Sequence, residues 1–172
     1  MKKVAIIGTQ GVPANYGGFE TLVENIIGEH HSDNIEYTVY CSAKDMPQKL
    51  YEYKGAKLKY VKWRANGVQS IIYDIISMIR SISGYDTILV LGVSGCVFLP
   101  FLKLLSRAKV IVNIDGLEHR RDKRTRSVRK FLLLSEVMAV KYAHTIIADN
   151  KGIADYVKWR YKKEAKLIAY GG

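Results

Sequence analysis

The sequence alternates short apolar runs with longer stretches in which apolar residues recur at helical spacing. Thr87–Leu91 and Lys109–Ile114 are runs typical of strands that are buried on both faces of a sheet. We expect strands at residues 3–8, 35–41, 57–63, 87–91, 109–114, 145–148 and 166–170, and helices at 19–27, 71–82, 97–105, 128–142 and 153–161. This order predicts an α/β fold with a doubly wound, mostly parallel, Rossmann-like sheet and helices on both faces.

The composition is that of an ordinary globular domain with a strong basic excess. The 172 residues are 48% hydrophobic and 25% charged, which suits one domain and makes disorder a poor description. The net charge of +11 favours an anionic partner. Nucleic acid, an anionic membrane surface and phosphorylated ligands all fit that charge.

Several classes of protein are disfavoured by what the chain contains. The apolar run after Met1 is too short for a signal peptide, and the uncharged stretch between Asp86 and Lys103 is too short and interrupted for a spanning helix, so we expect a cytoplasmic protein. Cys41 and Cys96 lie among apolar residues and are expected to be buried free thiols. No cysteine spacing indicates a metal site.

The loop of residues 8–18 is the most informative segment. It follows the first strand, carries four glycines and leads into an amphipathic helix. Such a loop suits phosphate or sugar hydroxyls at a helix N-terminus, although glycines that only make turns are the alternative. Its spacing is neither that of a dinucleotide site nor that of a P-loop, and no acid ends the second strand, so an NAD enzyme is disfavoured.

Two further loops are expected at the same edge of the sheet. One contains Ser94, and the other contains Asp115, Glu118 and His119. Carboxylates here can bind sugar hydroxyls or act as a general base, whereas an Asp-Gly turn is the simpler account of Asp115. Glu20 faces the same crevice, or only stabilises its helix N-terminus.

A basic segment follows the third of these loops. Its cations suit acidic phospholipid or the diphosphate of a lipid-linked acceptor, while a solvated loop is the alternative. Nucleic acid is disfavoured because no aromatic platform accompanies the charge. The residues expected to contact membrane or lipid phosphate are Arg120, Arg121, Lys123, Arg124 and Arg126.

Residues 8–21, GTQGVPANYGGFET, closely resemble the signature GTRGIPARYGGFET of the rhamnosyltransferase-like N-terminal domain in glycosyltransferase family 4. Residues 113–118, NIDGLE, are similar to that family's NVDGLEW, and residues 147–153, IADNKGI, to its IADSRGI. Leu134, Ser135 and Glu136 extend the resemblance, which spans the whole chain. His119 stands where the family has Trp, and Gln10 where it has Arg.

The resemblance implies one half of a GT-B fold, in which two Rossmann-like domains face each other across a cleft. Residues 1–172 would be the N-terminal acceptor-binding domain, and a C-terminal nucleotide-sugar-binding domain would lie outside them. The final strand followed by Gly171 and Gly172 agrees with a chain that continues into such a domain. The domain alone is expected to be inactive, because the acidic and phosphate-binding motifs of the second half are not in it.

The implied reaction is retaining transfer of a hexosyl or rhamnosyl group from a UDP- or dTDP-sugar, dTDP-rhamnose among them. The acceptor would be a glycan or a polyprenyl-diphosphate-linked sugar at the inner face of the cytoplasmic membrane, in biosynthesis of capsule, exopolysaccharide or other cell-surface polysaccharide. No cofactor and no metal are implied.

The resemblance also assigns roles to residues. Asp115 and Glu118 would be catalytic, with Glu20 and Asp115 on the acceptor side and Gly17 and Gly18 against the donor diphosphate or sugar. The substrate-binding residues expected altogether are Gly11, Asn15, Tyr16, Gly17, Gly18, Phe19, Glu20, Ser94, His119 and Asn150. A non-catalytic basic domain that binds anionic membrane or nucleic acid is the alternative function, and an NAD-type oxidoreductase is a third.

Overall fold

A single sheet organises the chain. The computed structural model describes residues 1–15, 17–29, 34–114, 116 and 125–169, and in this part of the chain eight strands form one sheet. Their order is β3-β4-β2-β1-β5-β6-β7-β8, and every neighbouring pair is parallel except β3 with β4. The strands are β1 (Lys2–Ile7), β2 (Ile35–Ser42), β3 (Glu52–Tyr53), β4 (Ala56–Val61), β5 (Thr87–Leu91), β6 (Lys109–Ile114), β7 (Thr145–Ala148) and β8 (Lys166–Leu167).

The strand order reverses at β1. From β1 the chain goes outward to β2 and β4, and then crosses to β5 on the other side of β1. Val4 of β1 is therefore paired with Tyr37 of β2 and with Thr87 of β5. At such a reversal the loops after the two central strands leave in opposite directions and open a crevice between them. The loops after β1 and β5 border that crevice.

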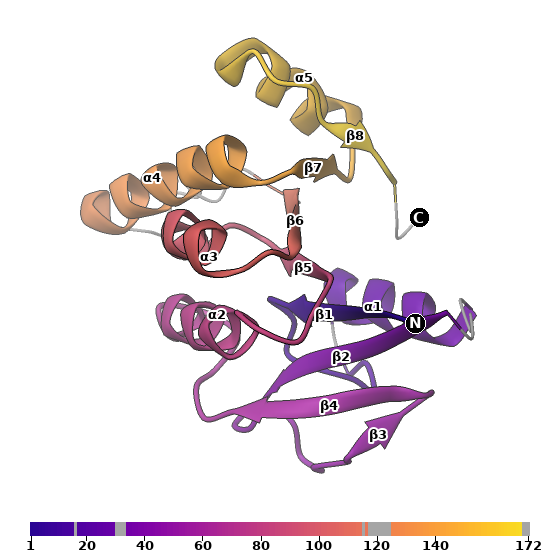
Figure 1. Ribbon diagram of the computed structural model, residues 1–172. Helices are drawn as coiled ribbons and strands as arrows, with labels where there is room; N and C mark the ends of the chain where they lie inside the picture. The colour runs from indigo at the N-terminus through magenta and orange to yellow at the C-terminus, as the bar shows by residue number, and fades with distance from the viewer. Residues whose placement is uncertain (16, 30–33, 115, 117–124, 170–172) are drawn as a thin grey trace.

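Helices cover both faces of the sheet. α1 (Gly18–Glu29) packs Val23 and Ile27 onto one face, against Ile6 of β1. α2 (Gln69–Arg80), α3 (Leu99–Leu105) and α4 (Arg126–Tyr142) lie side by side along the opposite face, as Figure 1 shows, and the short helix η1 (Cys96–Phe98) precedes α3. α5 (Lys151–Tyr161) packs with α4 in the same core. The predicted doubly wound, mostly parallel α/β fold is confirmed.

The core follows from the alternation of side chains along the strands. Ile88 and Val90 of β5 are fully buried beneath the helices of the α2 side, whereas Leu89 points to the α1 side and is only partly buried. Val112 of β6 and Ile146 of β7 extend the same buried layer. Each large side chain buried in this way contributes about 1.5–3 kcal/mol.

α2 buries its more polar side. The serines at positions 70, 77 and 81 are buried, and each hydroxyl donates to a backbone carbonyl within its own turn, at 2.7 Å for Ser70, 2.7 Å for Ser77 and 2.8 Å for Ser81. Because these hydroxyls are satisfied locally, small polar residues can pack against the sheet at little cost. Of the isoleucines in this helix, Ile76 packs partly buried against the core, whereas Ile72 and Ile79 are 42% and 48% exposed.

The remaining differences from the expected elements are small. The strand β3 was not predicted, because it has only two residues and joins β4 through a tight turn at Lys54 and Gly55, which both have positive φ. The last strand is shorter than expected and covers Lys166–Leu167. Cys41 and Cys96 are buried free thiols, as predicted. Among the described helices, none is long and apolar enough to cross a membrane.

Candidate functional site

A polar hollow of about 240 Å³ lies at the carboxyl ends of β1 and β5, where the strand order reverses. The loop after β1 contributes Gln10, and the start of α1 contributes Phe19 and Glu20. Ser70 and Asp74 of α2 form a further wall. Gly8, residues 65–67 before α2 and residues 91–94 at the end of β5 complete the lining. This is the position at which open parallel sheets bind their ligands.

The Glu20 carboxylate fixes the loop after β1. It is 7% exposed, and its Oε1 accepts hydrogen bonds from the Thr9 hydroxyl at 2.9 Å and from the Gln10 amide at 2.7 Å. On the opposite side of the loop, the buried Tyr73 hydroxyl lies 2.8 Å from the Thr9 carbonyl. The loop is therefore held from both helices that border the hollow, and its conformation is set before any ligand binds.

A second carboxylate holds the following part of the same loop. Glu24 accepts from the Ala14 amide at 2.8 Å through Oε2, and from the Tyr53 hydroxyl at 2.6 Å and Lys54 at 2.9 Å through Oε1. The hydrogen bond from Tyr53 is the main cause that lowers the pKa of Glu24, followed among the lowering contacts by Ala14 and Lys54. A charged Glu24 thus connects this loop to the turn between β3 and β4.

Two glycines permit close approach at the hollow. Gly8 has a φ of +98°, and a Cβ on it would lie 2.0 Å from the carbonyl oxygen of Leu91. A Cβ on Gly95 would lie 2.3 Å from the Cβ of Asp74. Neither position has room for a side chain, so the loops after β1 and β5 can lie directly against β5 and α2 respectively.

Asp74 is the unusual group in this wall. Its side chain is 3% exposed, and burial raises the pKa of its carboxyl to about 8, against a lowering contribution from the hydrogen bond with the Gly95 backbone. Within the described residues its Oδ1 atom has no hydrogen-bond partner. At neutral pH the group therefore retains a proton, and a neutral carboxyl can donate a hydrogen bond to a hydroxyl or carbonyl oxygen that enters the hollow.

Ser135 of α4 positions the loop after β5. Its hydroxyl donates to the carbonyl of Val93 and accepts from the amide of Val97 at 3.1 Å. Ser135 is fully buried, so these bonds are made away from water. Through them α4 fixes the backbone that carries Ser94 into the hollow.

The predicted site residues differ in where the structure places them. Phe19, Glu20 and Ser94 line the hollow together. Asn15, Gly17 and Gly18 are exposed on the same loop. Gly11 is buried and faces inward, because a Cβ on it would lie 2.9 Å from the Cys41 side chain. The predicted residues that lie outside the described part of the chain are Tyr16, Asp115, Glu118, His119, Arg120, Arg121, Lys123 and Arg124.

Asn150 and Arg126 lie away from the hollow's lining. Asn150 caps α5, and its side-chain oxygen accepts from the Ile153 amide at 3.0 Å. Arg126 is the exposed first residue of α4. Sequence reasoning missed Asp74, whose signal is the spacing of Ser70, Asp74, Ser77 and Ser81 along one polar stripe of an otherwise isoleucine-rich helix.

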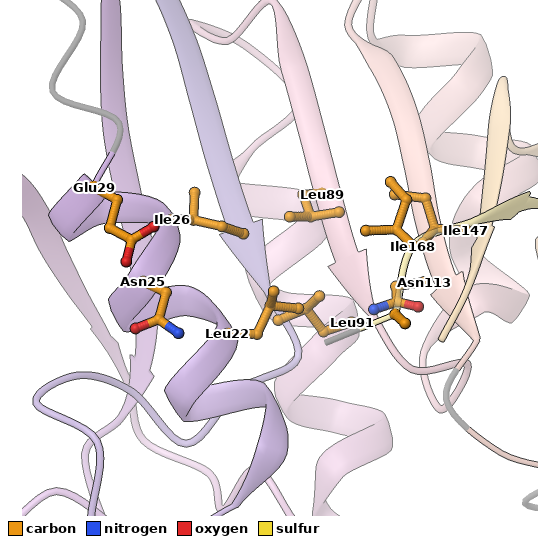
Figure 2. Close-up of a pocket in the computed structure, with 10 residues that line it drawn as sticks. Leu22, Asn25, Ile26, Glu29, Leu89, Leu91, Asn113, Ile147 and Ile168 are labelled. Carbon is orange, nitrogen blue, oxygen red and sulfur yellow. The ribbon is translucent and has the colours of Figure 1, made fainter. Parts of the chain in front are cut away.

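A second, larger hollow of about 410 Å³ lies on the α1 side of the sheet (Figure 2). Leu22 and Ile26 of α1 face Leu89 across it, and Ile147 and Ile168 border it on the far side. Its lining is mainly apolar, with no acid at its centre, and Glu29 stands at one end in Figure 2. Asn25 and Asn113 are its other polar residues, so this hollow is less polar than the one at the carboxyl ends of β1 and β5.

A doubly wound sheet whose strand order reverses at a polar hollow is a Rossmann-like fold. The chain belongs to the family described as a domain of unknown function, DUF1972, which matches residues 1–172. The search of curated proteins found no match.

Among solved structures, the chain is similar to sucrose-phosphate synthase from Thermosynechococcus elongatus, with a TM-score of 0.77 and 12% sequence identity. The match covers 100% of this chain and 49% of that protein, so the chain spans about half the length of the protein it resembles. At this identity the likeness concerns the fold, which is that of one half of a GT-B-like protein.

Proposed function

We propose that residues 1–172 are the acceptor-binding half of a GT-B glycosyltransferase that uses a nucleotide sugar. The reaction is transfer of a hexosyl or rhamnosyl group from a UDP- or dTDP-sugar to a glycan or polyprenyl-diphosphate-linked acceptor in cell-surface polysaccharide biosynthesis. A C-terminal domain supplies the donor site, and the inner membrane surface supplies the lipid-linked acceptor.

The observation that carries this proposal is the polar hollow at the reversal of the strand order. The family-4-like sequence of residues 8–21 builds one wall of it, and Glu20 within that sequence fixes the loop. The likeness to half of sucrose-phosphate synthase supports the same arrangement, because its name denotes a sugar-transferring synthase and the fold of this chain covers 49% of it.

The chemistry proposed for the hollow is recognition of sugar hydroxyls. Glu20 orients the loop that receives the acceptor, and Asp74 donates a hydrogen bond to an acceptor oxygen. Asp115 and Glu118 are the proposed catalytic residues, the former directly after β6. The transfer is proposed to retain anomeric configuration and to need no metal, so EDTA should leave its rate unchanged.

A transfer assay with the full-length polypeptide tests the proposal. Radiolabelled UDP-glucose, UDP-galactose and dTDP-rhamnose are each incubated with the protein and a short-chain isoprenyl diphosphate bearing one glucosyl unit. We expect label to enter the lipid-extractable product with at least one donor, and the Glu118→Gln and Asp115→Asn variants to reduce that rate by about 100-fold or more. No transfer from any nucleotide sugar to lipid-linked or free glycan acceptors would overturn the proposal.

A non-catalytic basic binding domain is the second candidate, favoured by the net charge of +11. It predicts salt-sensitive binding to anionic vesicles or oligonucleotides and no label transfer. Absence of transfer together with nanomolar binding to oligonucleotides would favour this second candidate.

A further inference from the structure

The helices on the α2 side turn large apolar side chains away from the sheet. On α3, Phe101 is 59% exposed, Leu104 82% and Leu105 58%. Ile72 and Ile79 of α2 and Leu134 of α4 are also exposed. The three helices are neighbours on one side of the sheet in Figure 1, with α3 between α2 and α4. We call these six residues, Ile72, Ile79, Phe101, Leu104, Leu105 and Leu134, the outer apolar face.

This exposure follows from how two of the helices are oriented. α2 buries Ser70, Tyr73, Asp74, Ser77 and Met78, and Ile72 and Ile79 are left on its exposed side. α4 buries Leu132, Ser135, Glu136, Ala139 and Val140, so Leu134 lies on the opposite side. An apolar stripe on a helix of a soluble domain ordinarily packs on the core. Here the exposed apolar residues of the three helices can instead contact a partner outside the domain.

The charges on these helices have one sign. α2, α3 and α4 are described throughout, and their carboxylates are those of Asp74 and Glu136, which are 3% and 1% exposed. The exposed charged residues on the three helices, and just after α3, are therefore all cationic. They are Arg80, Lys103, Arg107, Arg126, Lys130 and Lys141.

α4 shows how apolar and cationic groups are interleaved. Lys130, Leu134 and Lys141 are spaced by four and then seven residues, which places them on one stripe of the helix. A lysine whose stem lies along an apolar surface can still place its ammonium group in a charged headgroup layer. On these three helices, exposed apolar side chains are surrounded by Lys and Arg residues, with no exposed carboxylate among them. Such a surface is complementary to the interface of an anionic bilayer.

We infer that the outer apolar face is a docking surface for a lipid bilayer with anionic headgroups. The apolar tips of α2, α3 and α4 enter the boundary between headgroups and acyl chains, while Lys103, Lys130 and Lys141 contact headgroup phosphates. The inference rests on the proposed function in one respect, namely that the acceptor is carried by a lipid. It assigns membrane contact to α2, α3 and α4.

Vesicle flotation of the purified chain tests this surface without any nucleotide sugar. The chain is mixed with vesicles of phosphatidylcholine alone, or of phosphatidylcholine with 30% phosphatidylglycerol. The apolar variant is Phe101→Gln with Leu104→Gln, and the charge variant is Lys130→Gln with Lys141→Gln. Tyr51→Gln with Lys49→Gln is the matched control, because Tyr51 is 94% exposed and both residues lie near β3, away from these helices.

We expect the chain to float with the anionic vesicles and to remain at the bottom with phosphatidylcholine alone. The apolar and the charge variants should each lower the partition coefficient by about tenfold or more, while the control keeps it. Circular dichroism melts check that each variant is folded. Lack of binding to anionic vesicles, or binding that the apolar variant leaves unchanged, overturns the inference. So does light scattering that shows a stable dimer disrupted by the apolar variant. Because no donor is present, a failed transfer assay leaves these outcomes unaffected.

Discussion

The buried carboxyl of Asp74 makes the stability of the domain depend on pH in a way that one substitution should remove. Burial raises its pKa from 3.8 to about 8 in the folded state. An acid whose pKa rises on folding holds its proton more tightly in the folded protein than in the unfolded one. The group therefore does not change the free energy of unfolding below pH 3.8, the pKa in the unfolded chain. As the pH rises from there toward about 8, the pKa in the folded protein, the free energy of unfolding falls.

The magnitude follows from 1.36 kcal/mol per pKa unit. Between pH 5 and pH 7 the carboxyl is already ionised in the unfolded chain, whereas the folded chain still holds the proton, so the wild type should lose about 2–3 kcal/mol from this group over the interval. Asp74→Asn keeps an oxygen that can accept from Gly95 and carries no titratable proton. The variant should therefore gain about 2–3 kcal/mol relative to the wild type across the same interval.

Urea unfolding at pH 5, 6 and 7, followed by circular dichroism, measures this difference directly. Asp155→Asn, at an exposed position of α5, is the control and should keep the pH dependence of the wild type. A difference between Asp74→Asn and wild type that stays constant from pH 5 to pH 7 would refute the argument.

Three further predictions concern the same region. Glu20→Gln weakens the hydrogen bonds to Thr9 and Gln10 and should lower the free energy of unfolding, measured in urea melts, by about 1–3 kcal/mol. Glu29→Gln, at an exposed position, should leave it unchanged, and equal losses for both variants would contradict the role of Glu20 in holding the loop. Gly95→Ala brings a methyl group to 2.3 Å from the Cβ of Asp74 and should lower the free energy of unfolding by about 1–3 kcal/mol in the same urea melts. Gly18→Ala, where a Cβ would have nothing within 4 Å, should lower it far less, and a Gly95→Ala protein as stable as the wild type would contradict the close packing of this loop on α2. Burial raises the pKa of Cys41 to about 11, so iodoacetamide at pH 8 should leave Cys41 unmodified by mass spectrometry until urea unfolds the chain, and rapid alkylation of the folded protein would contradict its burial.

The sequence predicts the sheet well because strand signals there are strong and local. Thr87–Leu91 and Lys109–Ile114 are nearly uniform apolar runs, and both strands form over the predicted residues. β3 is absent from the prediction because a strand of two residues has no period to detect. It forms where the turn at Lys54 and Gly55 brings Glu52 opposite Lys57.

Helix orientation is less predictable than helix position. The isoleucines of α2 locate the helix, yet Ser70 and Ser77 are buried, since their hydroxyls donate to backbone carbonyls three and four residues earlier in the chain. Similarly, the stripe of Phe131, Leu134, Val137 and Met138 locates α4, but the fully buried side is that of Leu132 and Ala139. Which stripe packs depends on how closely a helix approaches the sheet, and that is a tertiary property.

In the candidate site, too, the residues that follow strands were predictable, whereas the one placed by helix packing was not. Glu20 and Ser94 were expected at the crevice because both follow strands that end at one edge of the sheet, and both line the hollow. Asp74 was not expected, because it comes from α2, a helix that is placed beside the hollow by its packing on the sheet and against Gly95. Its chemistry depends on burial, which arises from that packing.

The polar hollow between the loops after β1 and β5 is the proposed binding site of the sugar acceptor. A titration of the isotope-labelled chain with a short-chain isoprenyl diphosphate bearing one glucosyl unit, followed by amide NMR, tests it most directly. We expect saturable shifts at Gln10, Gly92 and Ser94, and their loss in Glu20→Gln. Shifts confined to the apolar hollow of Leu22, Leu89 and Ile147, or no shifts in the described loops, would contradict it.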